Sequence, residues 1–219
     1  MNELTEGIIS TKQVKSKKRV AEHGEVFTNE REVNAMLDLV KQETERIDSR
    51  FLEPACGNGN FLAEVLKRKL GVVSSRYNKS QIEWETYALT AIASIYGVDI
   101  LEDNAIECRK RLFDIFSKSY VSSFASNCKL EFLKSIKFLL ERNILWGDAL
   151  DFTNPVSKKP IVFSEWSIVS GNMVKRRDYI FKFLVEKKHQ FSLFNDEGNA
   201  AAIDEPVKDF PLIHYLKLG

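Results

Sequence analysis

Residues 51–62, Phe-Leu-Glu-Pro-Ala-Cys-Gly-Asn-Gly-Asn-Phe-Leu, constrain the fold more than any other stretch of this sequence. A short apolar run leads into glycines at 57 and 59, and Leu62, Val65, Leu66 and Leu70 follow at helical spacing. The pattern predicts a strand, a tight turn and a helix that continues to about Leu70. Because glycine leaves the backbone bare, a ligand can approach the amide groups at the start of that helix.

Strands and helices alternate along much of the remaining chain. A β-rich run at 96–101 carries Asp99, and another at 143–148 ends at Asp148. Helices are expected over about 30–47, 82–95, 105–116 and 132–140, with an irregular insertion at 72–83 and a serine-rich break at 117–127. This alternation predicts a mostly parallel α/β sheet. Ligands of such sheets bind at the carboxyl ends of the strands, so Glu53, Asp99 and Asp148 are expected in one pocket.

The two ends of the chain give weaker signals. Residues 11–19 carry five positive charges, which indicates either a solvated N-terminal segment or an arm that contacts phosphates. Beyond Asp148, we expect strands at 160–163 and 166–169 and a helix over 174–184. The last thirty residues are expected to be irregular.

Composition excludes several classes of protein. The 219 residues are 44% hydrophobic and 29% charged, which is ordinary for a globular domain. No apolar run approaches the roughly 20 residues of a membrane span, and the N-terminus does not resemble a secretory signal. Three cysteines, Cys56, Cys108 and Cys128, show no metal-binding spacing. We therefore expect a cytoplasmic protein with reduced thiols, no metal and no membrane contact. Its net charge of +1 does not by itself indicate nucleic-acid binding.

The residues around the glycine turn favour one class of ligand. A dinucleotide site requires a third glycine where Leu62 stands, and the Gly-Lys-Ser/Thr of a phosphate-binding loop is absent. The carboxylate of Glu53 would repel phosphates and would suit an ammonium group. Asp99 would accept hydrogen bonds from both ribose hydroxyls. Asp148 would accept one from the exocyclic amine of adenine, and Ile100 would pack on the face of the adenine ring. S-adenosylmethionine carries all of these groups.

Four segments resemble the motifs of the N6-adenine DNA methyltransferases of restriction–modification systems. Phe51–Leu62 is similar to their motif I, and His23–Asp38 to motif X, which normally reads Phe-Thr-Pro and has Asn29 in place of the proline. Tyr96–Asp103 resembles motif II, and Leu145–Leu150 resembles motif III. The four motifs come in the order of the subgroup that has motif X before motif I.

The resemblance implies a Rossmann-like S-adenosylmethionine-dependent methyltransferase fold, with an incomplete C-terminal half. It divides the chain into a basic segment at 1–22, a cofactor-binding domain at 23–190 and an irregular tail at 191–219. The cofactor-binding residues that it implies are Phe27, Thr28, Glu53, Cys56, Gly57, Gly59, Asp99, Ile100, Asp148 and Ala149. Asp99 and Asp148 have a second interpretation, as caps of the helices that follow them.

The catalytic motif of this family is not recognisable. It reads Asn/Asp-Pro-Pro-Tyr/Phe and holds the flipped-out adenine, whereas this chain contains no Pro-Pro pair. Asn172 is the candidate for its first residue, with a plain turn as the alternative. Lys175, Arg176 and Arg177 form either a solvated helix start or a grip on nucleic-acid phosphates.

These observations predict a DNA adenine-N6 methyltransferase subunit of a restriction–modification or related defence system. A companion subunit would supply the catalytic motif and target recognition. The alternatives are a non-catalytic cofactor-binding or assembly subunit and a methyltransferase that acts on RNA.

Overall fold

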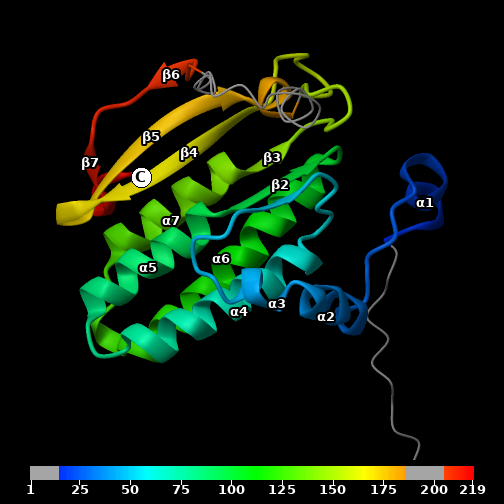
Figure 1. The fold of residues 1–219 in the computed structure, drawn as a ribbon. Coiled ribbons are helices and arrows are strands. Elements are labelled where there is room, and N and C mark those ends of the chain that lie inside the picture. Colours follow the sequence, from blue (N-terminus) through cyan, green and yellow to red (C-terminus); the bar gives the residue numbers. More distant parts are fainter. Residues whose placement is uncertain (1–14, 186–204) are drawn as a thin grey trace, which may run out of the picture.

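A computed structural model describes residues 15–185 and 205–219 and contains the predicted α/β sheet (Figure 1). Its strands are β1 (Phe51–Glu53), β2 (Ile95–Asp99) and β3 (Ile144–Trp146). They are parallel and follow the order β1-β2-β3, with Glu53 beside Gly97 and Asp99 beside Trp146. The predicted alternation and the parallel sheet are therefore confirmed, and the three carboxyl ends lie along one edge.

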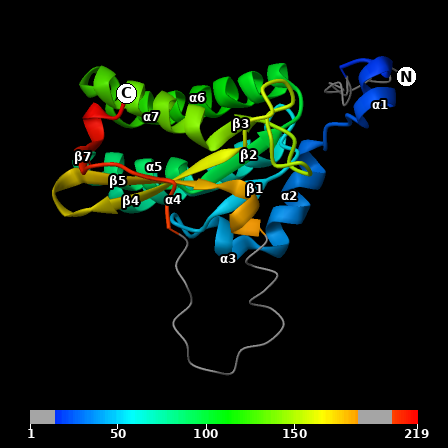
Figure 2. The same cartoon turned by 90° about the horizontal axis from the view of Figure 1, so that it is seen from above.

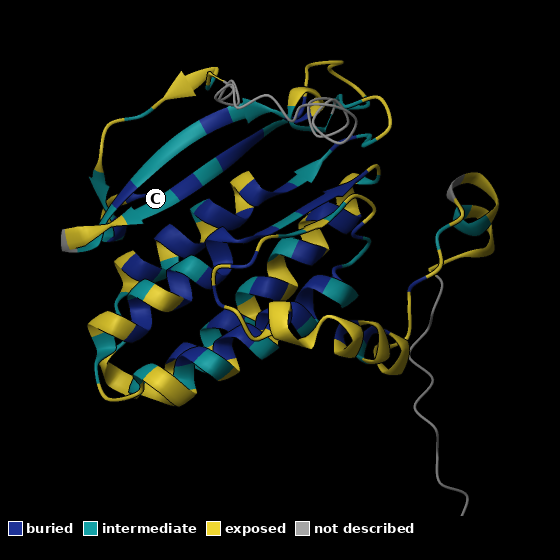
Figure 3. Ribbon diagram, in the orientation of Figure 1, coloured by how far each residue is buried: buried dark blue, intermediate teal, exposed yellow. Residues whose placement is uncertain are grey.

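Two helices connect each pair of neighbouring strands. α4 (Asn60–Tyr77) and α5 (Gln81–Ala93) follow β1, whereas α6 (Glu102–Phe124), η1 (Ala125–Asn127) and α7 (Leu130–Asn143) follow β2. Because both crossovers step in the same direction, right-handed connections place these helices on one face of the sheet (Figure 1). Their buried faces form the main core, which appears dark blue in Figure 3. None of the helices in residues 15–185 and 205–219 has the length and apolarity needed to span a membrane.

A β-hairpin covers the opposite face of the sheet. β4 (Val162–Val169) and β5 (Met173–Ile180) pair antiparallel through a turn that contains η2 (Ser170–Asn172). Between hairpin and sheet lies a second, smaller core of Val98, Ile161, Phe163 and Phe181. Tyr96 of β2 packs edge-to-face on Phe163 and donates its hydroxyl hydrogen to the Ser164 carbonyl at 3.1 Å.

The described end of the chain belongs to the fold. β6 (Lys208–Asp209) and β7 (Ile213–His214) both pair with β5, and η3 (Tyr215–Lys217) then brings the C-terminus against α7 (Figure 2). Residues 205–219 were expected to form part of an irregular tail, yet they extend the hairpin sheet and reach the main core. The rest of the expected tail, residues 191–204, lies outside the described residues.

Three short helices precede the sheet: α1 (Lys17–His23), α2 (Glu30–Leu39) and α3 (Lys41–Thr44). Asn29 caps α2, because its side chain accepts a hydrogen bond from the Arg31 amide at 2.8 Å. The expected single helix from 30 to 47 is wrong, since Val40 leaves the helical conformation with φ −119° and ψ 33°.

Several other expected segments are also corrected. The insertion at 72–83 is helical up to Tyr77 because Val73 is buried in the core, and α6 continues through the serine-rich break to Phe124 because Tyr120 is buried. The two strands expected at 160–163 and 166–169 form the single strand β4.

The helix expected over 174–184 is a strand up to Ile180. Val174 and Asp178, the two buried residues of β5, are four positions apart. That spacing places them on one side of a strand as well as on one side of a helix, so the sequence pattern alone did not distinguish the two.

Candidate functional site at the carboxyl edge of the sheet

The loop between β1 and α4 has a conformation that requires both of its glycines. Gly57 and Gly59 have φ values of 51° and 84°, in the left-handed region that favours glycine. A Cβ atom on Gly59 would lie 2.6 Å from Cys108 Sγ, and one on Gly57 would lie 3.1 Å from the Phe27 ring. The Cys56 amide donates to the Val98 carbonyl at 2.9 Å, which holds the loop against β2.

The segment before α2 lies against this loop. Phe27 is buried, and its ring lies against the bare backbone of Gly57. Thr28 is exposed, and its carbonyl accepts a hydrogen bond from Asn60 Nδ2 at 2.8 Å. The fold thus brings residues about thirty positions apart onto the same turn.

Asp99 closes the loop from the side of β2. Its Oδ2 accepts a hydrogen bond from the Gly57 amide at 2.7 Å, and its Oδ1 accepts from the Leu101 amide at 2.9 Å and from Asn104 Nδ2 at 3.2 Å. A carboxylate offers about four acceptor positions, so one on Oδ2 remains. In this arrangement Asp99 can receive one further donor, whereas the sequence prediction gave it both hydroxyls of a ribose.

Asp148 lies at the end of β3 and keeps one oxygen available. Its Oδ1 accepts hydrogen bonds from the Leu150 amide at 2.8 Å and the Asp151 amide at 3.3 Å, and Oδ2 has no partner in residues 15–185 or 205–219. Ile100 is 44% exposed beside this edge, and Ala149 is half-buried. The Trp146 indole donates its Nε1 hydrogen to the Ile100 carbonyl at 3.0 Å, which links the β2 and β3 ends.

Two more predicted residues flank the loop and differ in character. Glu53 is half-buried, burial raises the pKa of its carboxyl, and its side chain has no partner in the described part of the chain. Cys56 is buried, and its hydrogen bond with Cys108, together with burial, raises the pKa of its thiol. A thiol in that state packs as a small apolar group rather than as a nucleophile.

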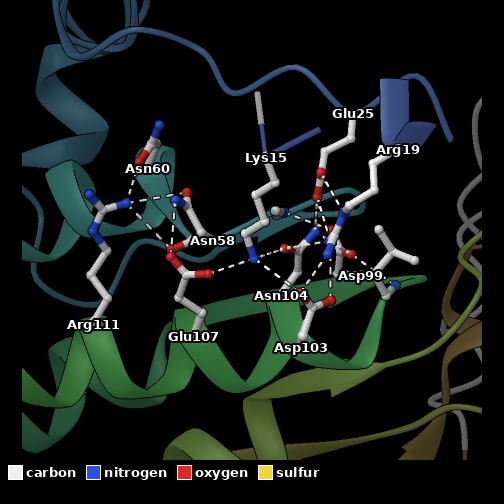
Figure 4. A network of polar contacts seen from close by, with 12 residues as sticks. Lys15, Arg19, Glu25, Asn58, Asn60, Asp99, Asp103, Asn104, Glu107 and Arg111 are labelled. Atoms are coloured by element: carbon white, nitrogen blue, oxygen red, sulfur yellow. Dashed lines mark hydrogen bonds and ion pairs between the residues drawn. The ribbon is translucent and has the colours of Figure 1, made fainter. Parts of the chain in front are cut away.

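A network of charged side chains covers the same edge from the N-terminal side (Figure 4). Arg19 donates to Asp103 Oδ2 at 2.6 Å, and Lys15 Nζ lies 2.6 Å from Glu107 Oε2. The hydrogen bond from Arg19, with a further one from Lys15, lowers the pKa of Asp103 to about 2. The part of the basic segment 11–19 that the structure describes is therefore docked on α6, which neither sequence interpretation included.

A groove of about 530 Å³ lies beside this network, between α4 and α6, with Phe27–Glu30 at one end. Arg111 reaches across it from α6 and donates hydrogen bonds to Asn58 and Asn60 at the start of α4. Lys110 and Lys118 also line it, on the same side of α6 as Arg111. Sequence reasoning missed these three cations, although the spacing of seven positions between Arg111 and Lys118 already places these two on one helix face.

The remaining predicted residues lie elsewhere. Asn172 sits in the β4–β5 turn with a φ of 59°, and its Oδ1 accepts a hydrogen bond from Thr86 of α5 at 3.3 Å. This turn and the arrowheads of β2 and β3 lie at opposite ends of the molecule (Figure 1). The fold thus does not bring Asn172 together with Gly57, Asp99 and Asp148.

The three basic residues that follow Asn172 lie on β5 and have carboxylate partners within the chain. Arg176 makes two hydrogen bonds of 2.8 Å to Asp178 and stacks over Phe210 at 4.2 Å from the ring centre. Lys175 pairs with Asp209, and Arg177 lies 3.9 Å from the same carboxylate. The interpretation of this segment as a helix start is wrong, and all three cations contribute to the hairpin sheet.

Comparison with known proteins gives no relative of this chain. No protein-family model matches it, and neither the curated proteins nor the solved structures include a significant match.

Proposed function

We propose that this chain is the S-adenosylmethionine-binding subunit of a DNA adenine-N6 methyltransferase in a restriction–modification or related defence system. A companion polypeptide would supply the catalytic motif and target recognition. The support comes from the carboxyl edge of the sheet, where residues from four sequence segments meet. The parallel sheet itself is compatible with a Rossmann-like methyltransferase fold.

The observation that carries the proposal is the unpaired carboxyl of Glu53. Half-buried acids normally have a partner, because an ionised carboxylate loses hydration energy on burial. Glu53 has none in the described residues, and it lies at the end of β1 next to a loop with bare backbone. An ammonium group at this position would favour the ionised carboxylate and lower its raised pKa. The amino-acid end of S-adenosylmethionine carries such a group.

Other groups at the edge fit the rest of the same ligand. One acceptor position remains on Asp99 for a ribose hydroxyl, and Oδ2 of Asp148 is available for an adenine amine. The exposed side chain of Ile100 directly follows the carboxyl end of β2. β2 pairs with β3, and Asp148 lies just beyond the end of β3. When bound, S-adenosylmethionine would supply an electrophilic methyl group, and these residues would hold and orient it.

The need for a companion follows from the second half of the chain. The sequence lacks the Pro-Pro-aromatic motif, and the candidate Asn172 lies on the hairpin turn, away from the edge. Among the described residues the parallel sheet has only three strands, and the chain that follows β3 forms an antiparallel hairpin instead. We therefore assign recognition of the target adenine in DNA to the partner.

Calorimetric titration with S-adenosylmethionine tests the proposal. We expect binding by the wild type, and Glu53→Gln should weaken it at least several-fold while preserving the shape of the side chain. The matched ligand is 5′-methylthioadenosine, which lacks the amino-acid group, and its affinity should not change in this variant. Absence of S-adenosylmethionine binding, with or without a companion, would refute the proposed function.

The partner requirement has its own test. An Asn/Asp-Pro-Pro-Tyr sequence is expected in a neighbouring reading frame, and DNA methylation should require both purified polypeptides. Methyl transfer by this chain alone would remove the need for a companion. Cofactor binding without methylation in any combination would favour a non-catalytic assembly subunit, and transfer to RNA alone would change the substrate class.

A further inference from the structure

The N-terminal strap, which we define as residues 15–25, is attached to the domain by polar contacts. No apolar residue described in it is buried; Arg19, Val20 and Glu25 are half-buried as whole residues, although the Glu25 side chain is only 7% exposed, and the others are exposed. Near its end lies Gly24, which has a φ of 64° and no atom within 4 Å of the position of a Cβ. Beyond it, Phe27 is anchored in the buried contact with Gly57. The strap can therefore separate from the domain without exposing core residues, by rotation near Gly24.

Asn104 connects the strap to the candidate site. Its Oδ1 accepts hydrogen bonds from Lys15 at 2.8 Å and Arg19 at 3.1 Å. Its Nδ2 donates one hydrogen to Glu25 at 2.7 Å and the other to Asp99 at 3.2 Å. All donors and acceptors of this amide are used, and the side chain is 1% exposed. While the strap is docked, Asn104 is held against Asp99, and Asp99 in turn holds the Gly57 amide (Figure 4).

The charges of this attachment are divided between two partners. The cations of the strap are Lys15, Lys17, Lys18 and Arg19, and the fixed surface of α6 presents Asp103 and Glu107. Arg19 also pairs at 2.7 Å with Glu25 of the strap itself. Lys17 and Lys18 are exposed to solvent, so two of the four cations already face outwards. A competitor that takes the strap from α6 must be negatively charged and must offer several anionic groups at once. A nucleic-acid backbone meets both conditions.

We propose that the strap is a latch over the carboxyl edge of the sheet and that the phosphates of DNA open it. In the closed state Lys15 and Arg19 bind the carboxylates of α6. When DNA arrives, these cations exchange Asp103 and Glu107 for phosphates, Asn104 is released, and Asp99 Oδ1 gains an acceptor position for a ligand in addition to the one already available on Oδ2. The choice of DNA as the polyanion rests on the proposed function, whereas the latch itself rests on the contacts of Asn104.

Hydrogen exchange and DNA titration on the full chain test the latch without any cofactor. In the wild type, a short DNA duplex should increase the exchange rates of the strap amides and of the Gly57 amide several-fold. Inorganic phosphate at the same ionic strength should have a much smaller effect. Opening by inorganic phosphate to the same extent would overturn the assignment to a nucleic acid, and unchanged exchange at Gly57 would overturn the coupling to the site.

Two double variants change opposite halves of the latch. Lys15→Gln with Arg19→Gln should weaken DNA binding and reduce the slope of log K against log salt by about 2, close to 0.9 for each lost phosphate contact. Asp103→Asn with Glu107→Gln should free the strap, speed exchange at Gly57 without DNA and strengthen DNA binding.

The matched control is Glu83→Gln with Glu131→Gln, which removes the same charge from exposed positions on α5 and α7. Equal strengthening by both acid-to-amide pairs, or an unchanged salt slope for the Lys15 and Arg19 variant, would overturn the proposal. The proposed function is tested separately by calorimetry. Cofactor binding with no DNA effect on the strap would refute the latch alone, and DNA opening without cofactor binding would refute the function alone.

Discussion

The carboxylate of Asp99 accepts a hydrogen bond from the backbone amide of Gly57, 2.7 Å away, across 42 positions of sequence. The bond joins the end of β2 to the loop after β1 and fixes the loop in the conformation that the two glycines allow. Asp99 therefore shapes the candidate site itself, in addition to any contact it makes with a ligand. Its substitution has consequences for folding that its position at a strand end did not suggest.

Asp99→Ala should lower the free energy of unfolding by about 3 kcal/mol, because three donors near the loop lose a charged acceptor. Urea denaturation followed by circular dichroism measures this change. Asp148→Ala is the control, since the amides that it caps lie in an exposed turn where water can replace the carboxylate. Its cost should stay below about 1 kcal/mol. Equal effects of the two substitutions would contradict the structural role of Asp99.

Gly59→Ala tests the close approach of the loop to α6. The added Cβ would lie 2.6 Å from Cys108 Sγ and would also be strained by the φ of 84°. Gly24→Ala provides a matched control, because its φ is 64° and the space around it is open. We expect a loss of about 1 kcal/mol for Gly24→Ala from backbone strain alone, and 2 to 4 kcal/mol for Gly59→Ala. Similar midpoints in urea for the two variants would show that the loop can move away from Cys108.

The first half of the fold could be predicted from the sequence because local signals agree there with the tertiary structure. Phe51–Leu62 contains its own strand, turn and helix start, and Asp99 and Asp148 follow short β-rich runs that pair side by side. The meeting of Phe27 with Gly57 was expected only from the resemblance to a methyltransferase motif, and the structure brings the two residues together.

The second half depended on information that is not local. Residues 174–180 form a strand because β4 pairs with them, and the spacing of Val174 and Asp178 did not reveal this. The strap is a further example. From the sequence, the segment that contains Lys15 and Arg19 was interpreted as either solvated or phosphate-binding. Their partners on α6 lie more than eighty positions away, where Asp103 and Glu107 share a helix face. Charge complementarity at that distance has no sequence pattern.

Lys69 is a buried cation that the helical pattern of α4 also concealed. Its Nζ donates to the Ile47 carbonyl at 3.0 Å and to the Ser94 hydroxyl at 2.5 Å, and these bonds partly offset removal from water. Burial nevertheless lowers its pKa from 10.5 to about 7. Between these two values the unfolded chain binds a proton that the folded chain does not, so stability should rise as pH increases from about 7 to 10.5.

Urea denaturation at a series of pH values measures this rise. Lys69→Met should remove the rise that Lys69 contributes, and it should also lower stability at pH 9.5 because buried carbonyls lose their donor. Lys67→Met, on the exposed side of the same helix, should leave the pH dependence as in the wild type. A pH profile that is identical for the wild type and Lys69→Met would contradict the lowered pKa.

Glu85 anchors the C-terminal segment to the helices. Its fully buried carboxylate receives hydrogen bonds from the Tyr120 and Tyr215 hydroxyls and lies 2.7 Å from Lys129 Nζ. Burial alone would raise the pKa of Glu85, but these donors outweigh it and hold the pKa below its ordinary value of 4.5. The stabilisation is therefore complete above pH 4.5 and is lost as pH falls through the lowered pKa.

Tyr215→Phe removes one donor to a charged acceptor and should lower the free energy of unfolding at pH 7 by about 1.5 to 3 kcal/mol. Because the carboxylate then loses part of what keeps it ionised, its pKa should rise and acid unfolding should begin at a higher pH than in the wild type. Both changes are measured by urea and acid titrations followed by circular dichroism. Glu83→Gln, which removes an exposed acid two positions from Glu85, should alter neither; an acid midpoint of Tyr215→Phe equal to that of the wild type would show that Tyr215 does not stabilise the Glu85 carboxylate.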